Sequence, residues 1–438
     1  MPFVRRVSAA ALVLAAGFTV ASADEKKVAD EKKTEVKAAA KTAVATPAIR
    51  LGGAPANPAE KLETTHKVSA AIDVKGKSGL RLQTLCLDSM GRVVGLVATP
   101  KPFGGPVKGA AAEVQVFDAD GKPLHDFKVD FHGMAVNAGP DGSVFVAGDG
   151  KIAKFDKDGK QVGKTAELPF VAELLKDTDA LKAKAEAQLK REKEQFAQSI
   201  GDAKKQFTEQ IKKLEEKKKE DRTKAEERQI DQFKKLVEQY DSMEKEQKSR
   251  TVEQVLADMT GRVRVTNGIA VSDKDVFVAC GDMGGYGYAV WRLSHDLKDP
   301  KQVLSGIGGC CGQMDIQCHG PDVLVAENTK KQFARYDREG KKLGGYGKGG
   351  ADTDPACFGG CCNPMNVRAS GTGDVYTAES EGIIKRFSPS GAFLETTGVV
   401  KLTGGCKNVA VGVNADASKL YFLDQPGSKF HILEKKAK

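Results

Sequence analysis

Residues 133–159 read GMAVNAGPDGSVFVAGDGKIAKFDKDG and contain three strand-like segments in succession. The apolar quartet GMAV is followed by a Pro-Asp-Gly turn, the β-branched segment SVFVAGD and a third segment that ends in Phe, Asp, Lys, Asp and Gly. Short apolar segments separated by Gly, Asp and Asn are typical of antiparallel β-structure. The stretch therefore predicts one unit of an all-β fold.

The same order of segments recurs along the chain. Each copy opens with an apolar quartet and continues with a β-branched strand and a third strand. The quartets are TLCL (84–87), GMAV (133–136), GIAV (268–271), QMDI (313–316), PMNV (364–367) and NVAV (408–411). Repeats of about 40–50 residues with four strands each are typical of β-propellers. We therefore predict an all-β propeller of six blades, with a seventh, partial blade from 51–80 as the alternative.

The last unit supplies only three visible strands before the chain ends. The segment KVSAAIDV (67–74) alternates like an outer strand and precedes the first unit. An unpaired outer edge invites aggregation, and pairing this segment with the last blade removes that edge. We expect residues 67–74 to close the ring.

The pattern GIAV, then DVFVA, then FDxDG resembles the NHL repeat, and the resemblance covers all six units. It implies a six-bladed propeller. NHL-like propellers include binding scaffolds, peptide-processing lyases and relatives of lactonases. The resemblance therefore implies a platform and does not specify a reaction.

The N-terminal segment has the features of an export signal. Arg5 and Arg6 precede an apolar run over 9–20, and Ala-Ser-Ala follows at 21–23. This order is typical of a cleaved signal peptide, here 1–23, and predicts a periplasmic or secreted protein. Residues 24–64, rich in Lys, Ala and Glu near their start, predict a disordered tether. No apolar run approaches the roughly 20 residues of a transmembrane helix.

Residues 171–256 interrupt the β pattern between two propeller segments, 65–170 and 257–438. Apolar residues recur there at spacings near seven, four and three, which is typical of amphipathic helices with coiled-coil-like packing. The polar stretch KKKEDRTKAEER (217–228) predicts the turn of an antiparallel hairpin, with one long bent helix as the alternative. We expect the apolar seam to bind a partner protein or a second copy of the chain.

The net charge of +9 does not point to nucleic acid. Acidic and basic residues are mixed along the chain, and no basic stripe carries interleaved aromatic residues. We therefore expect no nucleic-acid partner.

Cysteines and carboxylates fall at equivalent positions of several units. Cys310, Cys311, Cys361, Cys362 and Cys406 directly precede inner strands, whereas Cys280, Glu327 and Glu379 end second strands. In a propeller both positions lie on the same face. These residues are therefore predicted to converge at the mouth of the central channel.

Three interpretations of this cluster remain open. Disulfide bonds between neighbouring blades suit an oxidising compartment. A bound metal is the second, because thiolates suit zinc, copper(I) and iron–sulfur clusters. A reactive cysteine is the third, although the sequence places no histidine beside one.

The functional hypotheses follow from these patterns. We favour a non-enzymatic binding or scaffold protein, because the G-x-S-x-G and H-E-x-x-H motifs are missing. The alternative is a metal-dependent enzyme of the lactonase or lyase kind. His132 follows the cysteine-equivalent position of blade two, which is near the channel mouth, and a lone histidine there is more often a hydrogen-bonded loop residue than a ligand. Met314 and Met365 align with apolar core residues.

Overall fold

The computed structural model describes residues 62–100, 111–283, 287–309, 313–350, 354–360, 362–403 and 408–437. The predicted signal peptide and all but the last residues of the predicted tether lie outside these ranges. So do Cys310, Cys311, Cys361 and Cys406.

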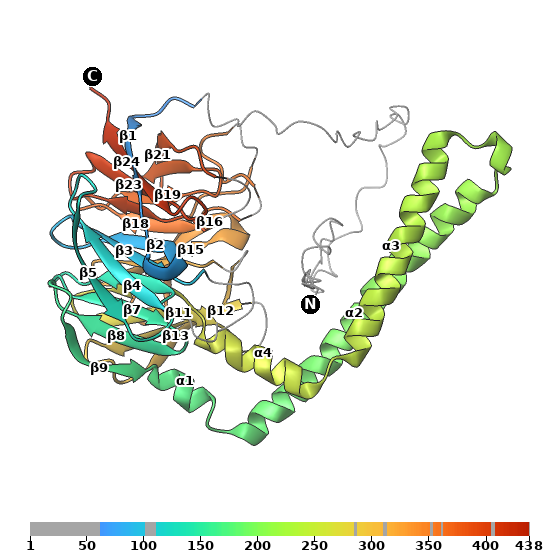
Figure 1. The fold of residues 1–438 in the computed structure, drawn as a ribbon, viewed down its shortest axis with the longest axis horizontal. Helices are drawn as coiled ribbons and strands as arrows, with labels where there is room; N and C mark the ends of the chain where they lie inside the picture. The colour runs from blue at the N-terminus through green and yellow to red at the C-terminus, as the bar shows by residue number, and fades with distance from the viewer. Residues whose placement is uncertain are drawn as a thin grey trace, which may run out of the picture. The chain divides into compact units, whose positions relative to one another are not determined.

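The described strands form six four-stranded antiparallel sheets (Figure 1). Each sheet corresponds to one sequence repeat. In five of them the four strands follow chain order from the innermost to the outermost, and in the sixth the outermost strand is the first strand of the chain. The first three sheets are blade one, β2 (Arg81–Leu87), β3 (Val93–Ala98), β4 (Ala112–Phe117) and β5 (Pro123–Val129); blade two, β6 (Ala135–Ala138), β7 (Val144–Gly148), β8 (Lys151–Phe155) and β9 (Gln161–Glu167); and blade three, β10 (Thr266–Val271), β11 (Asp275–Gly281), β12 (Gly287–Ser294) and β13 (Lys301–Gly308).

The remaining sheets repeat this order. They are blade four, β14 (Ile316–His319), β15 (Asp322–Glu327), β16 (Gln332–Tyr336) and β17 (Lys342–Tyr346); blade five, β18 (Asn366–Ala369), β19 (Val375–Ala378), β20 (Ile383–Phe387) and β21 (Phe393–Val399); and blade six, β22 (Val411–Val413), β23 (Lys419–Asp424) and β24 (Lys429–Lys435) with β1 (His66–Asp73) outside it. The innermost strands contact one another in the cyclic order β2, β6, β10, β14, β18, β22 and back to β2. This closed circle of six sheets is a six-bladed β-propeller.

Ring closure follows the prediction. β1 pairs antiparallel with β24, so that Ile72 lies opposite Phe430 and His66 opposite Lys435. The first strand of the chain is thus the fourth strand of the last blade. The edge of β24 is covered, as expected for a closed propeller.

The core lies between neighbouring blades. Phe117, Tyr421 and Phe430 are almost completely buried between blades one and six. Phe333, Phe358 and Phe387 fill the corresponding space between blades four and five. Strands buried on both faces explain the near-continuous apolar segments of the repeats.

The interrupting segment is helical. It contains α1 (Pro169–Leu174), α2 (Thr178–Glu215), α3 (Lys224–Ser249) and α4 (Val252–Arg264). The helical segment extends beyond the range 171–256 that was predicted from the apolar seam. Leu168, Phe170 and Val263 lie outside that range and are buried, so both ends of the segment belong to the folded core. Short 3₁₀ helices are η4 (Lys77–Gly79), η5 (Lys219–Asp221) and η6 (Asn328–Lys330). None of the described helices is long and apolar enough to cross a membrane.

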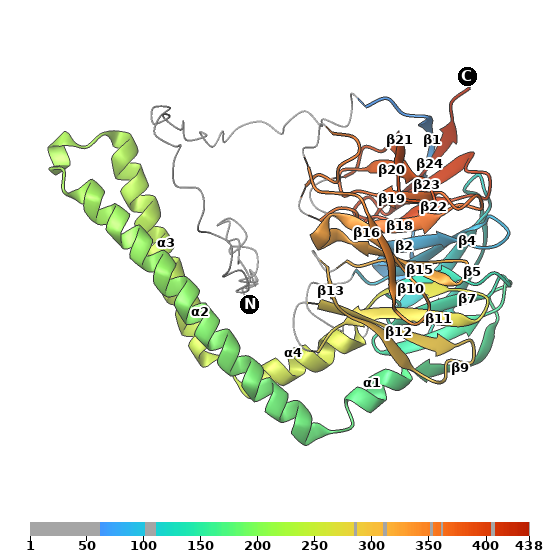
Figure 2. The same cartoon turned by 180° about the vertical axis from the view of Figure 1, so that it is seen from behind.

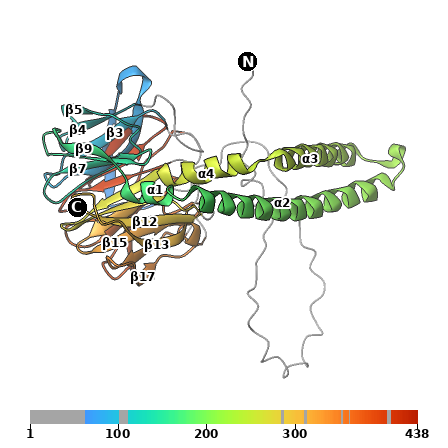
Figure 3. The ribbon, with the colours of Figure 1, turned by 90° about the horizontal axis from the view of Figure 1, so that it is seen from below.

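α2 and α3 contact each other and lie side by side in all three views (Figures 1, 2 and 3). The connection between them includes η5, within the polar stretch 217–228. Thr223 begins α3 with a capping box, because its hydroxyl accepts the Glu226 amide hydrogen while the Glu226 carboxylate accepts from the Thr223 amide. The two helices form an antiparallel hairpin, hereafter the hairpin, and not one bent helix.

Candidate functional site

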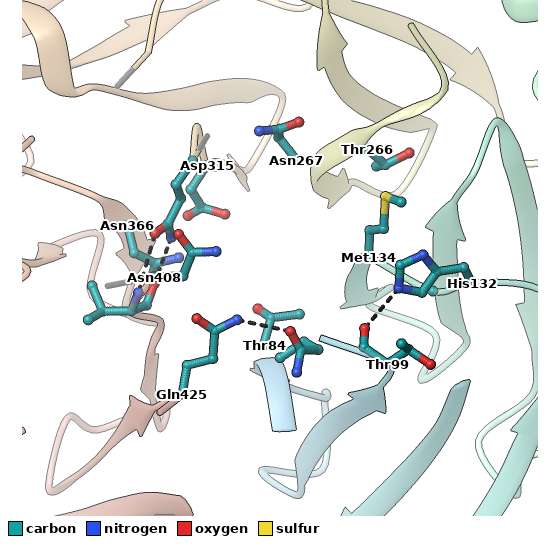
Figure 4. A pocket seen from close by; sticks show the side chains of 14 residues that line it. Thr84, Thr99, His132, Met134, Thr266, Asn267, Asp315, Asn366, Asn408 and Gln425 are labelled. Carbon is teal, nitrogen blue, oxygen red and sulfur yellow. Dashed lines mark hydrogen bonds between the residues drawn. The ribbon is translucent and has the colours of Figure 1, made fainter. Parts of the chain in front are cut away.

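A small polar pocket lies where the inner strands begin, around the propeller axis (Figure 4). All six blades contribute to it. The lining residues are Gln83, Thr84, Thr99, His132, Gly133, Met134, Thr266, Asn267, Gln313, Asp315, Asn366, Asn408, Val409 and Gln425. The cavity has a volume of about 40 Å³, which is room for a few waters or a small ion.

Amide side chains hold one side of the axial pocket in place. The Gln313 Nε2 donates to the Val409 carbonyl at 2.8 Å, and the Gln313 Oε1 accepts from the Val409 amide at 3.3 Å. Gln313 belongs to blade four and Val409 to blade six, so this side chain spans blade five. The Gln425 Nε2 likewise donates to the Gln83 Oε1 at 3.0 Å, joining blades six and one. These contacts fix the pocket wall by pairing blades across the ring.

A buried ion pair lies beneath the pocket. The Arg368 Nη1 lies 2.5 Å from the Asp315 Oδ2, which also accepts from the Val367 amide at 3.1 Å. Burial raises the pKa of Asp315 above its ordinary value, while the Arg368 guanidinium acts in the opposite direction. Because Asp315 is already paired, its carboxylate is only partly available to a ligand.

Further down the inner strands, polar side chains cross the channel. The Asn137 Nδ2 donates to the Ile269 carbonyl at 2.6 Å and to the Gln317 Oε1 at 2.9 Å. These bonds connect blades two, three and four.

His132 lines the opposite side of the pocket and is 3% exposed. Its Nε2 lies 2.9 Å from the Thr99 carbonyl oxygen, which can only accept a hydrogen bond. The Nε2 therefore carries the hydrogen, and the Nδ1 of the neutral ring keeps its lone pair. Within the described residues the Nδ1 is buried and has no hydrogen-bond partner. The expectation that His132 lies near the channel mouth agrees with this position.

The carboxylates predicted from the repeats are held within their own blades. Glu327 is fully buried and accepts from the Tyr336 hydroxyl at 2.5 Å and from the Gln332 side chain. Burial alone would raise its pKa, but these hydrogen bonds and nearby lysines hold the pKa below 4.5. Glu327 therefore joins the ends of β15 and β16 and does not line the axial pocket.

Glu379 has a comparable position in blade five. Its Oε1 lies 2.5 Å from the Lys385 Nζ, and its Oε2 accepts from the Asn363 Nδ2 at 3.3 Å. Lys385 is buried, donates to the Cys357 carbonyl and lies 5.2 Å from the centre of the Phe358 ring. Removing either member of a buried ion pair is strongly destabilising, which gives Glu379 a structural role.

Four of the five described cysteines are buried, and Cys318 is partly buried. Cys280 packs between blades two and three near Trp291, and burial raises the pKa of its thiol to about 12. Cys362 packs with Met365 and Val409 between blades five and six. Within the described ranges, no group of three or more His, Cys, Asp or Glu side chains is arranged to hold a metal ion. The predicted convergence of six cysteines is not tested, because four of them lie outside those ranges.

The polar residues of the axial pocket were not singled out in the sequence, apart from His132. Asp315 and Asn366 both occupy the third position of an apolar quartet, where blades two, three and six have alanine. Polar residues at a position expected to face the core were the available signal. Gln313 and Asn408 similarly occupy the first position.

Comparisons with known proteins leave the chain without an assigned family. No family model matches it, and no curated protein matches its sequence. Among solved structures, it is similar to regucalcin from Agrobacterium tumefaciens, described as a calcium-binding protein. The two chains share 13% identity over 86% of this chain and 98% of that chain, with a TM-score of 0.42. A likeness this distant carries no argument about function, and the propeller is established by its six sheets.

Proposed function

We propose that this chain is an exported, non-enzymatic binding protein whose hairpin joins two copies of the chain. The propeller acts as a rigid base for the hairpin and presents the axial pocket to a small ligand. The observation that carries the proposal is the way both ends of the helical segment are packed into the propeller.

The N-terminal end of the segment is fixed by α1. Phe170 is fully buried, and its ring stacks on Trp291 with centroids 4.6 Å apart and planes at 8°. Leu168 and Val171 are also fully buried in the core between blades two and three. The segment therefore leaves the propeller through an apolar anchor.

The C-terminal end returns to the same point. The Gly150 amide donates to the Arg264 carbonyl at 2.8 Å, and the Gly150 carbonyl accepts from the Leu168 amide at 2.8 Å. One residue of blade two thus bonds both the entry and the exit of the insertion. Because both ends of the helical segment are bonded to the propeller, the base of the helices is held more firmly than it would be by flexible linkers.

α4 strengthens this attachment. Val255, Met259 and Val263 are buried on one face of the helix, which contacts β11 and the start of α2. A Cβ added at Gly281 would lie 2.9 Å from the Arg262 carbonyl oxygen, so α4 approaches β11 closely. Packing of α4 on both the sheet and α2 connects the base of the hairpin to the ring.

The apolar seam of the hairpin is only partly covered. Phe207 packs against Phe233 and Tyr240, with ring centroids 5.2 and 6.1 Å apart. The seam residues that remain partly exposed are Phe196, Phe207, Leu214, Phe233, Leu236, Val237 and Tyr240. Two helices cannot enclose such a seam, whereas four can. The closely mixed charges of α2 and α3 suit a second copy of the same hairpin.

The engaged carboxylates support binding over catalysis. A metal-dependent lactonase- or lyase-like site needs carboxylates that are free to bind the metal. Glu327 and Glu379 instead satisfy hydrogen bonds and an ion pair inside their own blades. Their roles are accounted for by the stability of blades four and five.

A shortened hairpin tests the proposal. Residues 200–242 are replaced by a short Gly-rich turn, which keeps α1, α4 and the base of α2. We expect the complete protein to sediment as a dimer and the shortened protein as a folded monomer. Fluorescence of Trp291, the single tryptophan, reports whether the anchor remains intact. Equal sedimentation of the two proteins would show that the hairpin does not join copies.

A further inference from the structure

Met134 differs from its counterparts in the other five blades. The aligned residues in the second position of each quartet are Leu85, Ile269, Met314, Met365 and Val409. All five belong to apolar clusters between blades. Met134 belongs to none of these clusters and lines the axial pocket, which Val409 also reaches from within its cluster. Its thioether is thus placed among polar groups, where an apolar side chain gains little from burial.

The His132 Nδ1 faces the same region. In Figure 4 the sulfur of Met134 and the hydroxyl of Thr266 lie on the Nδ1 side of the His132 ring. The Thr266 side chain is buried, and its Oγ1 has no hydrogen-bond partner among the described residues. The Nδ1 and the Oγ1 are therefore two buried polar atoms without partners beside a thioether, in one cavity of about 40 Å³.

We propose that the axial pocket binds a copper(I) ion through the His132 Nδ1 and the Met134 Sδ. Thioether ligands select copper(I), and imidazole also suits copper. The Thr266 hydroxyl and the nearby amides line the space around the ion. Hard divalent ions such as Ca²⁺ need several oxygen ligands, whereas the carboxylate of this pocket, Asp315, is paired with Arg368.

The pattern His132-Gly133-Met134 explains why the two ligands meet. The residues lie two apart just before β6, and both line the axial pocket. The Thr99 carbonyl fixes the tautomer by accepting from the Nε2 at 2.9 Å. A hydrogen bond to the second ring nitrogen is the usual way in which proteins orient a histidine ligand.

This inference concerns the axial pocket alone and does not depend on the hairpin. A monomeric protein would overturn the proposed association and leave the copper site untouched. Conversely, loss of copper binding would leave the association intact.

Native residues of this chain supply the test variants. His132→Gln introduces the residue that blade one has at the aligned position, Gln83. Met134→Leu does the same with Leu85 as the precedent. Met314→Leu is the matched control, because Met314 is fully buried in the core between blades three and four. Each substitution introduces the residue type that blade one has at the aligned position, Gln83 or Leu85.

The experiment follows methionine methyl groups by NMR during an anaerobic titration with copper(I). The protein has nine cysteines, which also bind copper(I), so the titration continues beyond nine equivalents. We expect the Met134 methyl signal, identified by its loss in Met134→Leu, to shift while those of Met314 and Met365 do not. His132→Gln should weaken this response at least tenfold, and Met314→Leu should leave it unchanged.

Three results would overturn the proposal. The first is a Met134 methyl signal that stays in place throughout the titration. The second is a shift of the same size in His132→Gln, which would show that the imidazole is not a ligand. Zinc(II) in place of copper(I) should not shift the signal, and an equal shift with zinc(II) would contradict a soft-metal site.

Discussion

The propeller and the hairpin are stabilised in different ways. In the propeller, residues far apart in sequence pack together, as Phe117 does with Phe430, with ring centroids 5.3 Å apart. Its large core side chains are fully buried. In the hairpin, contacts join two adjacent helices, and Phe207 remains partly exposed. The stability of the ring is therefore collective and long-range, whereas that of the hairpin is local and incomplete.

The largest expected difference between the two regions comes from truncating one phenylalanine in each. Phe430→Ala removes a ring that is 0% exposed and contacts Phe117 and Tyr421. We expect it to lower the free energy of unfolding by about 3–5 kcal/mol. Phe207→Ala removes a partly exposed ring and should cost the hairpin about 1 kcal/mol. Thermal unfolding followed by Trp291 fluorescence and by helical circular dichroism separates the two effects.

Equal losses in the free energy of unfolding for Phe430→Ala and Phe207→Ala would contradict this comparison. So would a change in Trp291 unfolding caused by Phe207→Ala, since Trp291 belongs to the propeller core. Either result would mean that the hairpin and the ring unfold as one unit.

A second prediction concerns the anchor between the regions. Phe170→Ala removes the ring that stacks on Trp291. We expect a loss of about 3 kcal/mol, at the low end for a buried phenylalanine, because α1 is short and can detach locally. The fluorescence of Trp291 should shift to longer wavelength as water reaches it. Hydrogen exchange in α2 and α3 far from the anchor serves as the control and should stay the same.

The pH dependence should also separate the two regions. All six histidines lie outside the helical segment. Burial lowers the pKa of His431 below 6.5, and both of its ring nitrogens are buried without partners among the described residues. The folded propeller therefore keeps the His431 side chain neutral, whereas His431 in the unfolded chain binds a proton below pH 6.5. Stability of the propeller should fall as the pH drops from about 6.5.

The hairpin should respond only at lower pH. Hydrogen bonds from Lys217 and Thr223 lower the pKa of Glu226 from 4.5 to about 2. Its contribution is complete above pH 4.5 and is lost as the pH falls from 4.5 towards 2. Between pH 6.5 and 4.5, the midpoint of Trp291 unfolding should fall while helical circular dichroism stays constant. His431→Phe should reduce the fall, and an unchanged slope would rule out His431 as a cause.

The smallest expected effect lies at the tip of the hairpin. Thr223→Ala removes the hydroxyl that caps α3. We expect a loss of about 1 kcal/mol that is confined to the hairpin, measured as faster hydrogen exchange in the first turns of α3. Ser242→Ala, an exposed change within α3, is the control. Faster exchange in the propeller after Thr223→Ala would contradict the separation of the two regions.

Much of the fold follows from sequence periodicity. The predicted strand SVFVAGD (143–149) corresponds to β7, and the predicted closing segment 67–74 corresponds to β1. Both are recognisable because alternating side chains must face one core or another in every blade. The polar stretch 217–228 likewise predicted the connection between α2 and α3.

The site was less predictable for a physical reason. Glu327 and Glu379 align at the ends of second strands, which correctly indicates equivalent positions. Alignment does not show which neighbour satisfies a buried carboxylate, and Tyr336 and Lys385 do so from the next strand. Repeat position therefore predicted where these residues lie along the blade but not what they contact.

The amino-acid sequence by itself determined the number of blades, the strand that closes them and the helical character of the insertion. These properties depend on periodicity and on local turn and capping residues, which are read along the chain. Only the tertiary structure decided that side chains from all six blades line one axial pocket and that Gly150 bonds both ends of the helical segment. Those contacts join residues far apart in the sequence, which no local pattern relates.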